Sequence, residues 1–600
     1  MTHILEHAAG QPCMASAAEP SAENLPLSTA APPGRSAALA AAVLGSGLLA
    51  ACGGGGGGSS PASPSVQPSS AAPQTPMVLP TQQQAARFLG QAGFAATSAD
   101  MSTVTLQGYP AWLEAQFDMP PVVPTAYDWI NTQAGLNTLY STSPGDFAVW
   151  RRLISSPDVL RQRVVLALSE IFVISLSQLT VAYPGQMAAA YWDMLEKNAF
   201  GTYRQLLQAV SLSCAMGVFL NMRGNRKGDP VSGREPDENY AREVMQLFSI
   251  GLVQLNPDGS KQLDTNGQPI YTYTQADVSA FAAVLTGWDL DLAKGQTQSS
   301  DPSFTTRPMV NNPSYFTSGA KSVLGVAIPA SADGPTALGL ALDVLSTHPN
   351  NGPFIGRQLI QHLVCSNPSP SYVARVSAVF NDNGKGVRGD LRAVINAVLL
   401  DPEARSPMPG PANGKLREPI VRFVQWARTF HLGSPSGKWD IADQSNPSGR
   451  LGQSPLRAPS VFNFFAPGFV PANSTLGTNG ITAPEFQICN ETTVAGYLNF
   501  MQIVIPYGLG GNNGYGLGST SANKPDYSAE LAFASDPASL VARYNLLLAG
   551  AGLGADSVAT ITTAVTSVKV DPNNPNPGLM NRVWAAILLV MAAPDYLIQQ

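Results

Sequence analysis

Charged residues are scarce in this sequence. Among 600 residues there are 34 Lys+Arg and 40 Asp+Glu, so that 12% are charged and the net charge is −6. A typical globular protein has about 25%. No run of Lys or Arg exceeds two residues, and we therefore expect no nucleic acid partner. Because 44% of the residues are hydrophobic, full disorder is not expected either, and the length suits two or three packed subdomains.

Cysteine and histidine are also rare, with five of each. Three cysteines follow residue 52: Cys214, Cys365 and Cys489. They are odd in number and widely spaced, which predicts buried free thiols rather than disulfides. Three histidines follow residue 52: His348, His362 and His431. No H-E-x-x-H or paired Cys/His spacing occurs, so the sequence predicts no metal and no cofactor.

Familiar catalytic motifs are missing as well. The chain has no G-x-S-x-G, P-loop or dinucleotide-binding fingerprint in a suitable context. The glycine-rich stretch 508–514 follows no expected strand and is interpreted as a loop. The sequence therefore does not reveal a reaction through a motif.

The amino-terminal part looks like an export signal. Arg35 precedes an apolar run, Ser36 to Ala51, of about sixteen residues, which is too short for a transmembrane helix and suits a signal peptide. The run ends in Leu49-Ala50-Ala51-Cys52, typical of a bacterial lipoprotein cleavage box with Cys52 as the lipid acceptor. An ordinary cleaved signal is the alternative. We expect an outer-membrane lipoprotein in the cell envelope, facing the periplasm or the exterior.

Composition divides the chain into four parts. Residues 1–51 form the signal peptide, and residues 52–80 form a Gly/Ser/Pro-rich tether that cannot bury a core. Residues 81–431 are expected to form a helical core. Residues 432–600 are expected to form a loop-rich, partly helical carboxyl-terminal part packed on that core.

The body favours an all-α fold, a multi-helix array with long Gly/Pro/Asn-rich loops. Helical periodicity and end signals predict the following helices: 82–90, 104–118, 158–175, 186–198, 202–212, 237–250, 274–286, 337–348, 353–364, 370–380, 391–400, 415–431 and 581–591. Turn signals at 256–259 and 264–267 between short apolar runs predict one small hairpin or meander near 252–273. The segment 381–390 is interpreted as a turn rather than a calcium loop.

Glu170 lies in the second half of the expected helix from Asp158 to Ser175, and this half is apolar on every side. A carboxylate buried there must be paired or protonated. Arg161 and Arg163 lie two turns away on the same helix, and from this spacing neither is expected to reach Glu170. Glu170 is a candidate catalytic residue for this reason.

The densest polar stretch runs from Gly233 to Gly251. Asn239, Arg242, Glu243 and Gln246 recur at helical spacing and form a polar stripe. With Glu238, Glu243 could bind a metal or form an acid/base pair, but the two are about 140° apart around the helix. The alternative is a structural polar network that includes a Glu238–Arg242 pair.

Several isolated polar or aromatic residues remain as candidates for a ligand site or a structural polar network. They are Arg163, Asn239, Gln246, Trp288, His348, Arg357, Arg457 and Asn463. As a lone histidine before a proline, His348 favours a capping role. The loop 456–465 sets Arg457 and Asn463 among aromatic residues, where Arg457 is expected to be buried and to bond carbonyl groups. Arg357 and His362 are expected to point apart.

Blocks in a fixed order resemble the bacterial domain-of-unknown-function family DUF1800. They include 160–164, 198–201, Glu238 to Gly251, 273–278, Leu285-Thr-Gly-Trp288, 319–325, His348-Pro349 and 389–392. The resemblance covers about residues 82–600 and implies an exported, largely helical protein, often encoded beside an exported protein of alkaline-phosphatase or sulfatase type. One departure is Phe316, where the family often has histidine.

Two functions follow as hypotheses. The first is a lipid-anchored envelope protein, held to the membrane through Cys52, that binds an exported partner or a ligand without turning it over. The second is a hydrolase of an extracellular polymer or ester that uses Glu170, Glu238, Glu243 and Arg242. Two of these carboxylates across an open cleft would favour the enzyme.

Overall fold

The computed structural model describes residues 79–406, 413–510 and 514–600. Contacts divide the chain into the units Met1–Thr75 and Pro76–Gln600, and all described residues belong to the second. The signal run, Cys52 and the tether up to residue 78 lie outside the described residues. In the part that the structure describes, no helix combines the length and apolarity needed to cross a membrane.

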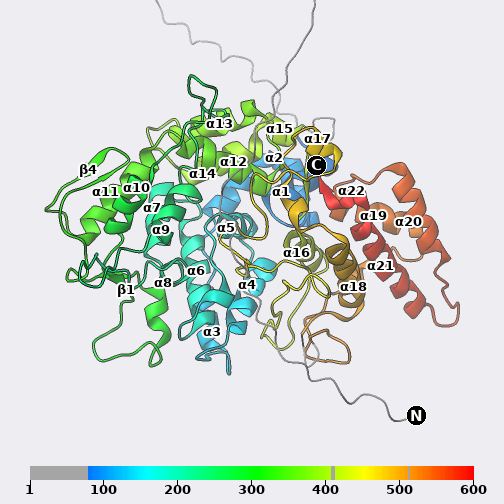
Figure 1. Ribbon diagram of the computed structural model, residues 1–600. Helices are drawn as coiled ribbons and strands as arrows, with labels where there is room; N and C mark the ends of the chain where they lie inside the picture. Colours follow the sequence, from blue (N-terminus) through cyan, green and yellow to red (C-terminus); the bar gives the residue numbers. More distant parts are fainter. Residues whose placement is uncertain (1–78, 407–412, 511–513) are drawn as a thin grey trace, which may run out of the picture. The chain divides into compact units, whose positions relative to one another are not determined.

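The unit is built from helices, as the all-α prediction required (Figure 1). Up to residue 284 they are α1 (Gln82–Ala92), α2 (Ser98–Asp118), α3 (Ala126–Thr132), α4 (Ser143–Ser155), α5 (Val159–Ile171), α6 (Pro184–Asn198), α7 (Tyr203–Leu212), α8 (Cys214–Phe219), α9 (Asn239–Gln246) and α10 (Gln275–Val284). Short 3-10 turns add η1 (Leu176–Gln178) and η2 (Pro302–Thr306).

The later helices complete the array. They are α11 (Gly334–Thr347), α12 (Asn351–Leu363), α13 (Pro370–Asn381), α14 (Leu391–Leu400), α15 (Pro402–Arg405), α16 (Pro419–Thr429), α17 (Thr475–Thr478), α18 (Glu491–Tyr507), α19 (Pro537–Ala549), α20 (Ala555–Ser567), α21 (Pro575–Ala592) and α22 (Pro594–Leu597). The 3-10 turns η3 (Pro484–Ile488) and η4 (Ser528–Glu530) lie among them.

Three two-stranded antiparallel sheets connect these helices in the described chain. β1 (Trp288–Asp289) pairs with β2 (Val310–Asn311), and β3 (Lys321–Val323) pairs with β4 (Val326–Ile328). β5 (Lys415–Leu416) pairs with β6 (Ile598–Gln599), with Lys415 opposite Gln599. The prediction of a helix over 415–431 was therefore wrong at its start, because the backbone of residues 415–416 bonds to β6 and Pro419 begins α16.

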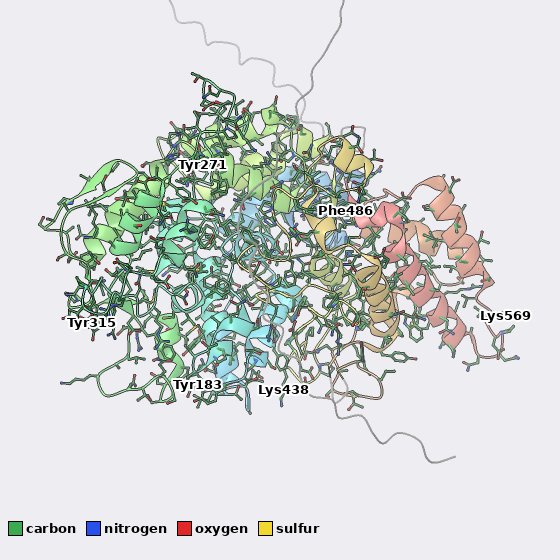
Figure 2. The ribbon with its side chains drawn as sticks, viewed as in Figure 1. Tyr183, Tyr271, Tyr315, Lys438, Phe486 and Lys569 are labelled. Atoms are coloured by element: carbon green, nitrogen blue, oxygen red, sulfur yellow. The ribbon has the colours of Figure 1, made fainter. Side chains whose placement is uncertain are left out.

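The predicted meander is present as a set of isolated bridges. Val253 pairs with Tyr271, and further isolated bridges lie nearer to the turns of the meander. Tyr271 is 72% exposed on this segment (Figure 2). Asn350, just before α12, fixes the meander: its Nδ2 donates to the carbonyl oxygens of Ile250 and Val253 at 2.8 and 2.7 Å, and its Oδ1 accepts from the backbone N–H of Leu255 at 2.8 Å.

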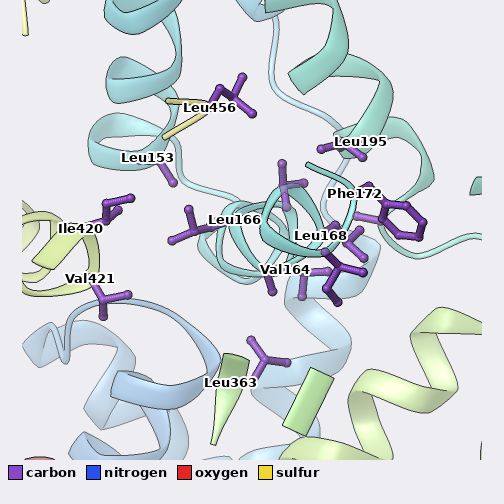
Figure 3. Packing of buried hydrophobic residues seen from close by; sticks show 14 of the residues in the cluster. Leu153, Val164, Leu166, Leu168, Phe172, Leu195, Leu363, Ile420, Val421 and Leu456 are labelled. Atoms are coloured by element: carbon purple, nitrogen blue, oxygen red, sulfur yellow. The ribbon is translucent and has the colours of Figure 1, made fainter. Parts of the chain in front are cut away.

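α5 lies at the centre of the core. It contacts α1, α2, α4, α6 and α12, and every residue from Leu160 to Phe172 is buried. Figure 3 shows Val164, Leu166 and Leu168 of this helix surrounded by side chains of other elements: Leu153, Leu195, Leu363, Ile420, Val421 and Leu456. The prediction that this run is buried on all faces is confirmed, and Glu170 is buried with it.

The free thiols differ in exposure. Cys214 is buried, Cys365 is half-buried and Cys489 is exposed, and none of them forms a disulfide. The expectation of free cysteines is confirmed, whereas the expectation of burial was wrong for Cys489. It follows η3 at the end of a loop instead of lying inside a helix.

Candidate functional site

Six ionisable side chains lie buried together where α5, α12, the start of α16 and η3 meet. We call them the buried ionisable cluster: Arg163 and Glu170 from α5, His362 from α12, Lys415 from β5, Glu418 just before Pro419, and Glu485 from η3. None of the six exposes more than 9% of its surface. Phe486, labelled in Figure 2, marks the position of η3. Buried charges at this density require close partners.

Short contacts link the members of the cluster. Glu170 Oε2 lies 3.0 Å from His362 Nδ1. Lys415 Nζ lies 3.1 Å from Glu418 Oε1 and 3.2 Å from Glu485 Oε1. The same ammonium group donates to the carbonyl oxygens of Gln361 and His362 at 3.0 and 2.9 Å. Lys415 is therefore the hub that holds two carboxylates and the end of α12 together.

The two carboxylates nearest His362 share one amide. Gln453 Nε2 donates to Glu418 Oε2 at 2.9 Å and to Glu170 Oε1 at 3.4 Å. Arg163 lies beside this group but does not hydrogen-bond to Glu170; its Nη2 donates to the carbonyl oxygen of His362 at 2.6 Å. The Arg163 guanidinium atoms Nε and Nη1 have no hydrogen-bond partner among the described residues.

Burial sets the protonation of the cluster. It raises the pKa of Glu170 well above the usual range, and the neighbouring Glu418 carboxylate adds to this rise. Burial lowers the pKa of His362 to about 3. Burial is the largest influence on Glu418 and opposes its ionisation, but Lys415, the contact with Glu170 and the nearby His362 and Arg163 together outweigh burial and bring the pKa of Glu418 below its usual range. With Glu418 and Glu485 ionised against Lys415 and Arg163, the cluster is electrically neutral when Glu170 holds a proton.

A cavity of about 280 Å³ opens beside the cluster. Its polar wall is formed by Glu170, Gln246, Gln358, Gln361, His362 and Glu485. The rest is apolar, with Phe354, Phe462 and Phe465 among the lining side chains. Gly251, with φ of 72°, passes so close to Phe354 that a Cβ there would lie 2.8 Å from the ring. The close approach of backbone and aromatic ring thus closes one side of the cavity.

Gln358 has an unused donor at this cavity. The side chain is 6% exposed, and its Nε2 has no hydrogen-bond partner among the described residues. Gln361, by contrast, donates from Nε2 to the carbonyl oxygens of Ser366 and Pro467. Since buried polar groups are nearly always hydrogen-bonded, the free amide of Gln358 indicates a position for a bound polar group.

The stripe on α9 has its own partners. Glu238 accepts from Gln275 Nε2 and from the hydroxyl of Ser279 at 2.7 Å, and these hydrogen bonds keep the pKa of Glu238 below its usual range. Arg242 pairs with Glu238 at 3.2 Å. Asn239 is exposed at the start of the helix. The Glu238–Arg242 pair of the structural alternative is therefore present.

Glu243 is placed differently from Glu238. It is buried, its Oε2 has no hydrogen-bond partner among the described residues, and burial raises its pKa. No side chain in the described part hydrogen-bonds to both carboxylates. Neither of them lines the cavity at Glu170, although Gln246 of the same helix does. The structure thus separates the carboxylates that the hydrolase hypothesis had grouped together.

The isolated candidates have mostly structural contacts. Arg457 donates to the Asp146 carboxylate at 2.5 and 2.9 Å. The expectation that it bonds carbonyl groups was therefore wrong, because a buried acid on α4 supplies a charged partner. His348 ends α11 and its Nδ1 accepts from the backbone N–H of Asn350, as a capping residue does. Arg357 donates towards Thr482 at 3.4 Å, away from the His362–Glu170 contact.

Two further candidates are buried in other places. Trp288 lies in β1, and its Nε1 has no hydrogen-bond partner in the described part. Asn463 is 9% exposed with φ of 60°, and its Nδ2 is likewise unpartnered among described residues. Neither residue lines the cavity beside the cluster.

Sequence reasoning missed most of the cluster. It found Glu170 and Arg163, but expected of His362 only that it points away from Arg357, and placed Lys415 in a helix. Glu418 and Glu485 were not singled out. One signal in the sequence was Glu418, the acid directly before Pro419. It stands at the start of an apolar helix, and its carboxylate is buried together with the start of that helix.

Fold and site together define a mainly α-helical protein with a buried ionisable cluster at the wall of an aromatic cavity. The model of the family described as "Protein of unknown function (DUF1800)" matches residues 87–598, and the chain belongs to this family. No curated protein and no solved structure matches the chain significantly.

Proposed function

We propose that this protein is an exported, lipid-anchored envelope protein that binds the apolar part of a ligand or exported partner in the cavity beside the buried ionisable cluster. Export and the anchor are supported by the apolar run before Cys52 and the tether after it. Binding is supported by the cavity, in which aromatic side chains face a short polar wall. Apolar sites with a few convergent polar groups are typical of ligand binding.

The observation that carries the binding proposal is the unpartnered Nε2 of Gln358 in the polar wall of a cavity that is otherwise lined by apolar side chains. A ligand with an apolar body and one hydrogen-bond acceptor would fill the cavity and satisfy this donor. A larger cavity of about 780 Å³ lies near the start of α6, but its lining includes no Asp, Glu, Lys, Arg or His. The smaller cavity therefore offers the more specific site.

Filling the cavity tests this proposal. Ala466 lines it, so Ala466→Phe should abolish binding. The control is Ala327→Phe on β4, an exposed position in another part of the fold. Thermal shifts would be measured with 2-naphthol and octanoate, and co-purification would be measured from detergent-solubilised envelopes. Ligand or partner capture that is equal in both variants would contradict binding in this cavity.

The anchor is tested separately through Cys52. Wild type should fractionate with membranes and incorporate labelled palmitate, whereas Cys52→Ala should lose the label and leave the membrane fraction. The control is Cys214→Ala, which removes a buried thiol in the body. If Cys52→Ala remains in the membrane with its label, the anchor is not at this residue.

Hydrolysis is a second candidate, favoured by the 3.0 Å contact between Glu170 and His362 at the cavity wall. A carboxylate that orients an imidazole is a common general-base arrangement. The lining contains no serine, threonine or cysteine among its described residues, so water would be the nucleophile. Turnover of short-chain p-nitrophenyl esters that is lost in Glu170→Gln, but kept in Glu238→Gln, would favour this candidate.

A further inference from the structure

We propose that Glu170, His362 and Glu418 bind one divalent transition metal ion at the wall of the aromatic cavity. The inference goes beyond the binding of an apolar ligand and stands even if that proposal fails. Each of the three residues offers one ligand atom, and these atoms all lie within 4.8 Å of one another. They come from three separate segments of the chain, α5, α12 and the residue before α16.

The spacing of two of the atoms already suits a metal. Glu170 Oε2 and His362 Nδ1 lie 3.0 Å apart. Metal–ligand bonds of about 2.0–2.2 Å place neighbouring ligand atoms about 3–3.5 Å from each other. The ligand oxygen of Glu418 must move by about 1–2 Å at most towards the other two ligand atoms to reach the same spacing. One imidazole with two carboxylates suits zinc, iron(II) or manganese(II) rather than calcium.

Outer contacts hold the carboxylates in place. Lys415 Nζ binds Glu418 Oε1 at 3.1 Å, and Gln453 Nε2 binds Glu418 Oε2 and Glu170 Oε1. Glu170 Oε2 receives no hydrogen bond from a described residue other than the contact with His362. Hydrogen bonds of this kind, from residues that do not bind the metal themselves, orient metal ligands. They leave Glu170 Oε2 free, and this oxygen faces His362 Nδ1.

The charges of the cluster favour a cation as well. Three carboxylates, Glu170, Glu418 and Glu485, face two fixed positive charges, Lys415 and Arg163. One negative charge is therefore uncompensated when all three acids are ionised. A divalent ion beside Glu170 offsets this charge, changing the net charge of the cluster from −1 to +1, and uses the lone pair of the neutral imidazole.

The cavity gives such an ion open coordination positions. Glu170 and His362 both line it, while Gln358 adds an unpartnered Nε2 in the same wall. With only three protein ligands, the remaining positions are free for water or for a polar group of a cavity ligand, an arrangement typical of catalytic rather than structural zinc sites. Gln358 is placed to donate a hydrogen bond to that group.

Metal binding is measured by titrating chelator-treated protein with Zn²⁺ in a calorimeter and by elemental analysis after dialysis. Wild type should retain about one equivalent. Glu170→Gln keeps the shape of a neutral carboxyl group and should fold, and His362→Gln removes the nitrogen ligand. Both should weaken binding by about 10–100-fold or more, since loss of second-shell groups alone costs that much.

Glu243→Gln is the matched control, because Glu243 is another buried carboxylate with an unpartnered oxygen. It should bind like wild type, with circular dichroism confirming the fold of every variant. Absence of stoichiometric zinc in wild type, or equal affinity in Glu170→Gln and Glu243→Gln, overturns the proposal.

Co²⁺ reports on the open positions. Acetohydroxamate should change the visible spectrum of the Co²⁺-loaded wild type, and Ala466→Phe should keep the metal but lose this response. If acetohydroxamate leaves the wild-type spectrum unchanged, the ion has no position open to the cavity, and that part of the proposal fails.

Discussion

The ion pairs of this protein do not all contribute equally to stability. Arg152 on α4 forms two hydrogen bonds with Glu196 on α6, at 2.7 and 2.5 Å, with both side chains almost fully buried. Arg204 and Asp343 also form a close pair, but the Asp343 side chain is 59% exposed. The buried pair has two hydrogen bonds and the exposed pair has one, and the two pairs also differ in solvation.

Replacing Glu196 should therefore be costly. Glu196→Ala leaves the buried Arg152 guanidinium with one hydrogen bond, to the carbonyl oxygen of Val122, and with Asp158 at 4.0 Å as the remaining charged partner. We expect a loss of about 3–5 kcal/mol in the free energy of unfolding. Asp343→Ala should cost less than about 1 kcal/mol, because water screens the exposed pair. Urea denaturation of both variants measures this difference. Equal losses would contradict the role of burial.

Asp193 on α6 predicts a pH effect. Its carboxylate accepts from the backbone N–H groups of Ala126 and Tyr127 at 2.7 and 2.9 Å. Burial, followed by these hydrogen bonds and the nearby Glu196, leaves the pKa of Asp193 at about 7, above its ordinary 3.8. Between these values the folded state binds more protons than the unfolded state, so this residue's contribution to stability falls as pH rises.

Asp193→Asn removes this titration. Its stability relative to wild type should therefore increase from pH 4 to pH 7, as measured by urea denaturation at several pH values. Asp343→Asn, which removes an exposed carboxylate, is the control variant and is measured at the same pH values. A parallel curve for Asp193→Asn would show that Asp193 titrates normally.

At the scale of elements, short polar contacts fix segments that have little regular structure. The meander 252–273 has only isolated bridges, and Asn350 holds it through three hydrogen bonds to residues 250, 253 and 255. Asn350 is 1% exposed, so nothing replaces these bonds when the side chain is removed. The residues before α12 thus position both the meander and the helix that carries His362.

Asn350→Ala should lower the free energy of unfolding by about 1–3 kcal/mol, because it leaves buried backbone groups without partners. Hydrogen exchange in peptides covering 252–272 should become faster. Asn266→Ala, at an exposed turn of the same meander, should change neither quantity measurably. Exchange that is unchanged in Asn350→Ala would mean that the bridges alone hold the segment.

Elements with clear periodicity and end signals could be predicted from the sequence. α14 begins and ends as expected, and Thr274, where a helix was predicted to start, is the N-cap of α10 and forms a capping box with Asp277. α18 to α20 were not predicted individually, because α18 is apolar around most of its surface and α20 is rich in small and β-branched residues. Such segments give no amphipathic signal for a helix.

At the scale of the whole molecule, the site could not be predicted because its parts are far apart in sequence. The burial of Glu170 followed from its apolar neighbours. Its contact with His362 joins residues 192 positions apart (362 − 170), and Glu485 is more distant still. No local spacing encodes such contacts; they depend on how α5, α12 and α16 pack.

The site also depends on the last residues of the described chain, because β6 pairs with β5, the strand that carries Lys415. Gln599 lies opposite Lys415, and its Nε2 donates to the carbonyl oxygens of Leu363 and Val364 at 3.0 and 3.1 Å. Removing residues 598–600 should therefore destabilise the fold by about 2–4 kcal/mol through several lost buried hydrogen bonds. Thermal denaturation measures the loss.

Gln600→Ala is the control for this truncation, because the backbone oxygen of residue 600, which accepts from Arg87 and Gln91, is kept. Its melting temperature should equal that of wild type. A truncated chain that melts like wild type would show that β6 is dispensable and that Lys415 is held by its other contacts.

The wide separation of the cluster residues also has a consequence for biosynthesis. Arg163 and Glu170 leave the ribosome more than 300 residues before Glu485 (485 − 170 = 315). Until Glu485 has been synthesised, Arg163 and Glu170 cannot be enclosed and remain hydrated. The core around the buried ionisable cluster therefore cannot be completed early in synthesis. Late closure through such distant contacts slows folding.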